Sequence, residues 1–181
     1  MAKSKSALIF TWNGFQDQEL VYPYYRLKGA GFHVETVADS RDDKGRIYGI
    51  LGVNMPCESL WEDFHAQPEP KKYSYDLLVL PGGVKSLEKL RQDERAIECI
   101  AGWGELNKPI ASICHGAQLL ISAGLVRGRV IAAYYSLKID VENAGGKYSR
   151  SPVEIDGNII SSPHYDFMGE WMEAVLANIP N

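Results

Sequence analysis

The segment Asp76–Leu80, which is apolar after its first residue, limits the fold of this chain more than any other feature. A strand with one wet face alternates apolar and polar residues, whereas a central strand of a parallel sheet is apolar throughout because helices cover both faces. We expect further strands at 7–10, 32–38, directly before Cys114 and at 130–133, with helices at 17–30, 93–106 and 166–176. This alternation predicts a doubly wound α/β sandwich with a mostly parallel central sheet.

The rest of the chain is less regular. Glycines and prolines recur between residues 39 and 72, where we expect short strands and loops. Asp156-Gly157 predicts a hairpin between 153–155 and 158–160, because Asp-Gly suits a tight turn between paired strands. A length of 181 residues is enough to bury a core without disulfides, and we expect one domain, 1–181.

Cys114 is the leading candidate for a nucleophile. It lies in Ser112–Gly116, between an expected strand and a helix that continues through 117–121. A thiol at such a turn lies beside the unpaired N–H groups and the positive end of the helix dipole. Both favour the thiolate, so we expect the pKa of this thiol to be lowered. The arrangement resembles the nucleophile elbow of hydrolases, with cysteine in place of serine.

Three turns are expected at one edge of the sheet, where ligands of open α/β sheets bind. They are 13–16, 81–83 and 114–116. The substrate pocket is therefore predicted at this edge. The Pro81-Gly82-Gly83 turn has neither a G-x-G-x-x-G nor a G-x-x-x-x-G-K pattern around it, so nucleotide binding has little support.

Composition argues against several other functions. The net charge is −4 without a basic tract, which disfavours nucleic-acid binding, and no apolar run reaches the roughly 18 residues that span a bilayer. The first six residues lack the apolar region of a signal peptide, and three cysteines without a C-x-x-C pair fit a reducing cytoplasm. The histidines and cysteines show no metal-ligand spacing, so we expect neither a metal nor a cofactor.

Several segments together resemble the ThiJ/PfpI superfamily, within it the PfpI-type intracellular protease/amidase branch, which has a class I glutamine amidotransferase-like fold. The matching segments span nearly the whole chain in order: 19–28, 76–83, 108–116, 122–129, 142–146 and 156–158. The resemblance implies a flavodoxin-like sandwich with a nucleophile elbow. It also implies a homodimer or a larger homo-oligomer, a small-molecule substrate, and no nucleic-acid or membrane partner.

The resemblance also implies roles for particular residues. Cys114 would be the nucleophile and His115 its neighbour, with Glu88 orienting that histidine, in some members across a subunit interface. Backbone N–H groups at Gly83, next to Gly82, and at the Cys114–His115 turn would form the oxyanion site. Tyr134 would line the pocket. His115 has a second interpretation, in which its backbone starts the helix and its ring packs near a dimer contact.

One departure from the family concerns the partner of the sulfur. The family places a glutamate in the first turn, where its protonated carboxyl hydrogen-bonds the cysteine. Aligning Glu19-Leu20 with the family puts Gln16 at that position. A glutamine N–H can donate to a thiolate, but it cannot exchange a proton at neutral pH.

A second departure is His164-Tyr165-Asp166, which follows Pro163 where the branch has an arginine. The same place carries a His-x-Glu pair in glutamine amidotransferases, where it completes a triad. We therefore hypothesise that His164 reaches toward Cys114 and that Asp166 fixes its tautomer. The alternative is a solvated histidine at a helix start, with Asp166 as an ordinary N-cap.

The leading prediction for function is a cysteine-dependent hydrolase or lyase that acts on a small electrophilic carbonyl, amide or related group. Its activity would be glyoxalase- or deglycase-like, or amidase- or peptidase-like. One alternative is an oxidative-stress or redox sensor, in which Cys114 is oxidised and the output is holdase activity or partner binding. Another is a specialised pathway hydrolase or hydratase that uses a triad of Cys114, His164 and Asp166.

Overall fold

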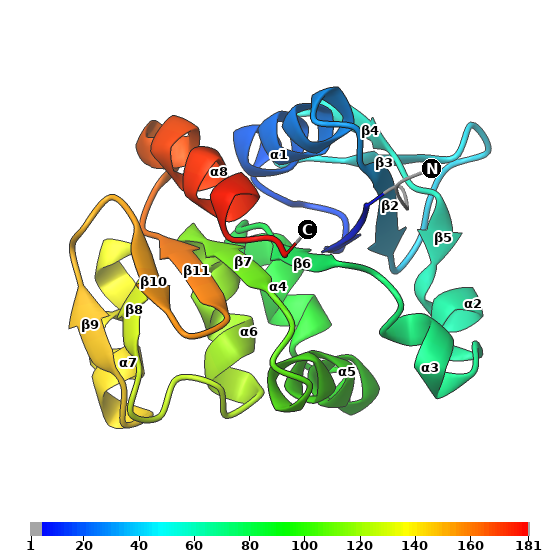
Figure 1. Cartoon of the computed structure of the whole chain (residues 1–181). Helices are drawn as coiled ribbons and strands as arrows, with labels where there is room; N and C mark the ends of the chain where they lie inside the picture. The colour runs from blue at the N-terminus through cyan, green and yellow to red at the C-terminus, as the bar shows by residue number, and fades with distance from the viewer. Residues whose placement is uncertain (1–4, 181) are drawn as a thin grey trace.

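The computed structural model describes residues 5–180, and these residues form a central sheet of seven strands (Figure 1). Residues 1–4 and residue 181 lie outside the described residues. The expectation that the N-terminal segment is not a signal peptide concerns residues 1–4 among others, so it falls in part outside them. The strand order is β10-β11-β7-β6-β1-β2-β5, and only β10 runs antiparallel to its neighbour. The bounds are β1 Ser6–Phe10, β2 His33–Ala38, β5 Ser59–Leu60, β6 Leu77–Leu80, β7 Ile110–Ile113, β10 Glu154–Asp156 and β11 Ile159–Ser162.

Helices cover both faces of this sheet (Figure 1). Helices α1 (Asp17–Gly29) and α8 (Met168–Ala177) lie on one face, and α4 (Val84–Leu90), α5 (Glu94–Glu105) and α6 (Ala117–Ser122) lie on the other. Successive residues of a strand point to opposite faces, so β1 contributes Ala7 and Ile9 to one buried cluster and Leu8 and Phe10 to the other. The doubly wound sandwich predicted from the sequence is confirmed, as is the apolar character of its central strands.

Smaller elements extend the two ends of the sheet. The segment that we expected to be irregular contains an antiparallel pair, β3 (Arg46–Tyr48) and β4 (Asn54–Pro56), and the helices α2 (Trp61–His65) and α3 (Glu69–Lys72). On the other side, β8 (Val130–Ala132) pairs in parallel with β9 (Lys147–Ser149), and α7 (Lys138–Asn143) packs beside β9. The predicted Asp156-Gly157 hairpin is confirmed between β10 and β11.

None of the helices within residues 5–180 is long and apolar enough to cross a bilayer. Helix α1 has 13 residues, whereas a membrane-spanning helix needs about 20. The expected lack of nucleic-acid and membrane partners, the homo-oligomeric state and the cytoplasmic location are not tested by these features and stay predictions, as does the extent of the domain.

The predicted edge of the sheet carries three adjoining turns, which follow β1, β6 and β7. Backbone conformations with positive φ occur at Gly14 (91°), Gly83 (112°) and Cys114 (57°). The backbone N–H of Gln16 donates to the carbonyl of Gly82 at 3.1 Å, which joins the first turn to the second. The fold thus brings together three loops that lie about 30 to 100 residues apart in the sequence.

Candidate functional site

Cys114 lies at a strained turn between strand β7 and helix α6. Its φ of 57° lies in the left-handed region, which costs a non-glycine residue conformational energy. The residue begins a 3-10 turn, Cys114–Gly116, and a Cβ atom at Gly116 would come within 2.3 Å of the Leu80 carbonyl oxygen. Only glycine therefore lets the turn pack this closely on β6. The elbow predicted from the sequence is present.

The carboxyl group beside the sulfur belongs to Glu19, on the first turn of α1. Its side chain is fully buried and lies close enough to the Cys114 thiol to shift the pKa of that thiol, while its Oε2 accepts a 2.7 Å hydrogen bond from the Gly82 N–H. A Cβ atom at Gly82 would lie 2.2 Å from that oxygen and 3.0 Å from the Cys114 Cβ. Residue 82 must therefore be glycine if the carboxyl group is to reach the thiol.

This geometry corrects two predictions. Gln16, expected beside the sulfur, is the N-cap residue of α1, and its Nε2 donates to Gln18 Oε1 at 2.7 Å. Glu19, one helical turn further on, occupies the position beside the sulfur that the sequence analysis assigned to Gln16. Gly82, placed with the oxyanion site, gives its N–H to Glu19, which leaves Gly83 as the glycine that borders the cavity.

The protonation of this buried pair also differs from our expectation. Burial raises the pKa of Glu19 from 4.5 to about 7. The pKa of the Cys114 thiol is raised, not lowered, because burial disfavours the thiolate and the nearby Glu19 charge repels it. A backbone hydrogen bond from His115 opposes this shift only in part. When Glu19 is protonated, that repulsion disappears and its O–H can donate to sulfur.

The ring of His115 lies beside the Cys114 sulfur. Its Nδ1 lies 3.3 Å from the Cys114 Sγ, within hydrogen-bonding reach for sulfur. Burial lowers the pKa of His115, so the ring is neutral at pH 7 and Nδ1 can accept a proton, although the charge of Glu88 raises this pKa to a smaller extent. Within the described chain Glu88 lies 3.7 Å from Arg91, and its carboxylate is half exposed.

His164 lies on another wall of the same cavity. Its Nδ1 is 3.1 Å from Asp166 Oδ2 and 3.3 Å from the Asp166 backbone nitrogen, which accounts for one of its two ring nitrogens. The Tyr134 ring stacks on His115 at 4.5 Å and lies 6.1 Å from the His164 ring. The predicted His164–Asp166 pair is therefore formed, whereas the histidine in contact with sulfur is His115. Asp166 is not the N-cap of the following 3-10 turn, because His164 has that position.

These groups line a cavity of about 250 Å³. The sequence predicted five of its lining residues besides Cys114, namely Gln16, Gly83, His115, Tyr134 and His164. It missed Glu19, Ile50, Val84 and Tyr165. Glu19 had a recognisable signal, since it is four and eight residues before Pro23 and Leu27, on the buried face of α1. Ile50 had none, because it lies in the loop between β3 and β4.

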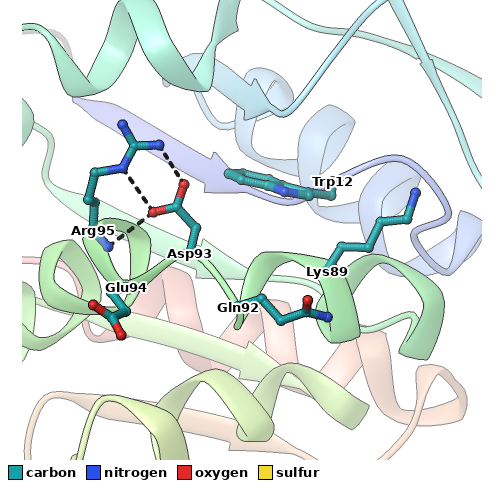
Figure 2. A pocket seen from close by; sticks show the side chains of 6 residues that line it. All are labelled: Trp12, Lys89, Gln92, Asp93, Glu94 and Arg95. Carbon is teal, nitrogen blue, oxygen red and sulfur yellow. Dashed lines mark hydrogen bonds and ion pairs between the residues drawn. The ribbon is translucent and has the colours of Figure 1, made fainter.

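A larger cavity of about 580 Å³ lies at the other end of α4 (Figure 2). It is lined by Trp12, Lys89, Gln92, Asp93, Glu94 and Arg95. Arg95 there forms ion pairs with Asp93 at 2.7 Å and with Glu62 at 2.8 Å. Among residues 5–180, no group of three or more histidine, cysteine or acidic side chains is arranged to hold a metal ion.

Comparison with known proteins places the chain in a family. Residues 5–178 match the model of the DJ-1/PfpI family. The deglycase PfpI of Pyrococcus furiosus is 36% identical over 165 residues, which cover 91% of this chain and 93% of that protein. The putative cysteine protease YraA of Bacillus subtilis is 31% identical and covers 88% and 89% of the two chains. The structure of Schizosaccharomyces pombe DJ-1 shares the fold, with a TM-score of 0.86 over 97% of this chain and 92% of that one, at 20% identity.

Proposed function

Because the chain belongs to the DJ-1/PfpI family, we propose that it is an enzyme in which Cys114 attacks a small carbonyl or amide substrate. The reaction is hydrolysis or a lyase-type rearrangement, as in the deglycases and the putative cysteine protease to which the chain is similar. The observation that carries the proposal is the pair of groups beside the Cys114 sulfur: His115 Nδ1 lies 3.3 Å away, and the Glu19 carboxyl group is close enough to shift the pKa of the thiol.

The first step forms a bond between sulfur and the substrate carbon. The thiol proton moves to Nδ1 of neutral His115, the sulfur pair enters the carbonyl carbon, and the C=O pair moves to oxygen. Gly83, which borders the cavity at the turn after β6, is the backbone donor that we assign to this oxyanion. With an amide, the C–N bond then breaks, the amine leaves with the proton from His115, and a thioester remains.

The second step releases the product. We assign the His164–Asp166 pair to this step: in the tautomer whose Nδ1–H donates to Asp166 Oδ2, Nε2 can accept a proton from water, and Nδ1 then no longer accepts from the Asp166 backbone N–H. The water oxygen bonds to the thioester carbon, the C–S bond breaks, and sulfur regains a proton. With an aldehyde substrate the first adduct is a thiohemiacetal, and the same two histidines are available for its proton transfers.

The protonated form of Glu19 supports this chemistry. Its O–H stabilises the thiolate during the attack, and its burial keeps it partly protonated near pH 7. The redox-sensor alternative needs the same thiolate, so the raised pKa of Cys114 gives it no advantage over the enzyme. A homodimer or larger assembly remains part of the proposal, and so does an orienting role for Glu88.

The test compares wild type with Cys114→Ser on methylglyoxal, glycated amines and peptide anilides. We expect turnover of at least one substrate class by the wild type and a loss of about 10³-fold or more in Cys114→Ser with the fold retained. Intact-mass analysis of quenched reactions should show a covalent adduct on Cys114. Cys99→Ala is the matched control, since Cys99 is a buried thiol of helix α5 away from the cavity. Equal activity of wild type and Cys114→Ser on all substrates would refute the proposal.

A further inference from the structure

The cavity at Cys114 has an unusual charge composition for a site that handles polar substrates. Among the described residues that line it, there is neither a lysine nor an arginine. Its chargeable side chains besides Cys114 and two tyrosines are Glu19, His115 and His164. Burial lowers the pKa of His115, so this ring is uncharged at neutral pH. The lining therefore offers an anionic substrate no permanent positive charge.

The groups around the cavity are acidic. Glu19 lies fully buried against the sulfur, and the charge of Glu88 is felt at His115. Asp166 lies 3.1 Å from His164, so protonation of that ring creates an ion pair and not a free cation. A carboxylate or phosphate that entered the cavity would find no positive charge to replace its hydration and would be repelled by the ionised fraction of Glu19, whose pKa is raised to about 7.

Positive charge is nearby but lies in a separate cleft. Lys85 and Lys89, one turn apart on α4, line a cleft of about 210 Å³ together with Asn13 and Tyr48. Ile50 lines both this cleft and the Cys114 cavity. The isoleucine side chain thus stands at the boundary between the two lysines and the thiol.

Aromatic rings form the remaining wall of the Cys114 cavity. The His164 ring lies 3.9 Å from Tyr165, 6.1 Å from Tyr134 and 6.2 Å from Tyr135, with planes that differ by 37°, 30° and 20°. Tyr134 in turn stacks on His115. Rings inclined in this way present extended faces that favour planar groups. The exposed side chains of Ile50 and Val84 complete an apolar border.

We infer that the site selects uncharged carbonyl compounds that carry a planar aromatic or apolar group, and that it discriminates against substrates with a carboxylate or phosphate next to the reacting carbon. The inference rests on the proposed function in taking the bound molecule to be a substrate. The selectivity itself rests on the cavity alone. A volume of about 250 Å³ admits one ring together with the reacting group but excludes a folded polypeptide.

Alkylation of Cys114 tests the selectivity without requiring turnover. Iodoacetamide, iodoacetate and N-phenyliodoacetamide each form an S–C bond and release iodide, but they differ in charge and in the ring. Rates are followed by peptide mass and divided by the rate of the uncharged model thiol N-acetylcysteine methyl ester. We expect the normalised rate for iodoacetate to be at least about tenfold below that for iodoacetamide. We expect N-phenyliodoacetamide to exceed iodoacetamide by about threefold to tenfold.

Two substitutions should shift these ratios in opposite ways. Ile50→Lys places a cation at the border of the cavity, at a half-exposed position, and should raise the normalised iodoacetate rate several-fold. Tyr165→Leu removes one ring and should reduce the advantage of the phenyl reagent. Leu106→Lys and Tyr25→Leu are matched controls, since both residues are exposed and neither lines the cavity. These controls should leave all three rates unchanged.

Equal normalised rates for iodoacetate and iodoacetamide would overturn the inference. So would a faster iodoacetate reaction that Lys85→Ala abolishes, because the cationic cleft would then serve the thiol. If the proposed function fails but the selectivity is correct, the alkylation pattern holds and no carbonyl or amide is turned over. Turnover by Cys114 with equal alkylation rates would keep the enzyme and remove the selectivity.

Discussion

The cavity beside Cys114 and the larger one beside Trp12 differ in how their charged groups are paired. In the Trp12 cavity, Arg95 pairs with Asp93 (Figure 2). Arg95 also pairs with Glu62, and Asp93 accepts a hydrogen bond from Trp61 Nε1 at 2.8 Å. In the Cys114 cavity, Glu19 is buried without a counter-ion, and its Oε1 has no hydrogen-bond partner among the described residues. Paired charges stabilise a surface, whereas an unpaired buried acid leaves a proton available for chemistry.

The largest expected effect concerns the histidines. His115→Ala should lower kcat/KM by about 10²- to 10⁴-fold, because its Nδ1 lies 3.3 Å from the sulfur and accepts the thiol proton in the proposed first step. His164→Ala should slow release of the covalent intermediate more than its formation, so that the adduct accumulates in quenched samples. His65→Ala, in the region of the second cavity where the ring lies 5.1 Å from Trp61, serves as the control and should leave kcat/KM unchanged. Slower adduct formation in His164→Ala than in His115→Ala would instead favour the direct triad.

The next effect is on stability. A carboxyl group whose pKa is raised from 4.5 to about 7 by folding takes up a proton on folding between these values. The contribution of this carboxyl group to the free energy of unfolding is complete below pH 4.5 and is lost as the pH rises through 7. Relative to Glu19→Gln, the free energy of unfolding of the wild type should therefore fall by about 3 kcal/mol between pH 4 and pH 8. Urea unfolding at several pH values measures this difference, and parallel curves for the two proteins would contradict it.

The smallest effect has the opposite sign and belongs to the other cavity. The Arg95 guanidinium lowers the pKa of Asp93 from 3.8 to about 2. The contribution of ionised Asp93 to the free energy of unfolding is present above pH 3.8 and is lost as the pH falls through 2. Asp93→Asn should therefore remove about 1 kcal/mol or less of stability at pH 6 and progressively less below pH 4, with kcat/KM unchanged at neutral pH. A change in turnover would mean that the two cavities are coupled.

Much of the fold was predictable because its signals are local. Apolar strands, the Asp156-Gly157 turn and the elbow at Cys114 each depend on a few consecutive residues. Helices α4 and α7 were not predicted, since both are short. The pKa of Cys114 could not be predicted either. Its direction depends on how deeply the thiol is buried and on the charge of Glu19, which comes from a helix about a hundred residues earlier in the chain.

The assignment of Gln16 shows a more specific limit. Positions 16 and 19 are one turn apart at the start of α1, so both approach the same edge of the sheet, and both line the cavity. A local alignment without gaps distinguishes them only if the turn before the helix has the expected length. The packing against Gly82 decides between them, because that glycine leaves room for the carboxyl group of Glu19. Such a contact between distant segments leaves no trace in local periodicity.

The buried carboxylate of Asp17 has a consequence for how this protein can diverge. It accepts hydrogen bonds from the N–H groups of Leu51 and Val53, both at 2.8 Å, and Ile50 N–H donates to the Phe15 carbonyl at 2.9 Å. The loop between β3 and β4 is thus fastened to the start of α1 through main-chain groups, so the fastening does not depend on the side chain of residue 50, although residue 49 must stay glycine because a Cβ atom there would lie 2.4 Å from Asp17 Oδ1. Residue 50 can change while the thiol, its acid and its histidine stay in place. Descendants of this chain can therefore acquire new substrates through one loop without rebuilding their reactive centre.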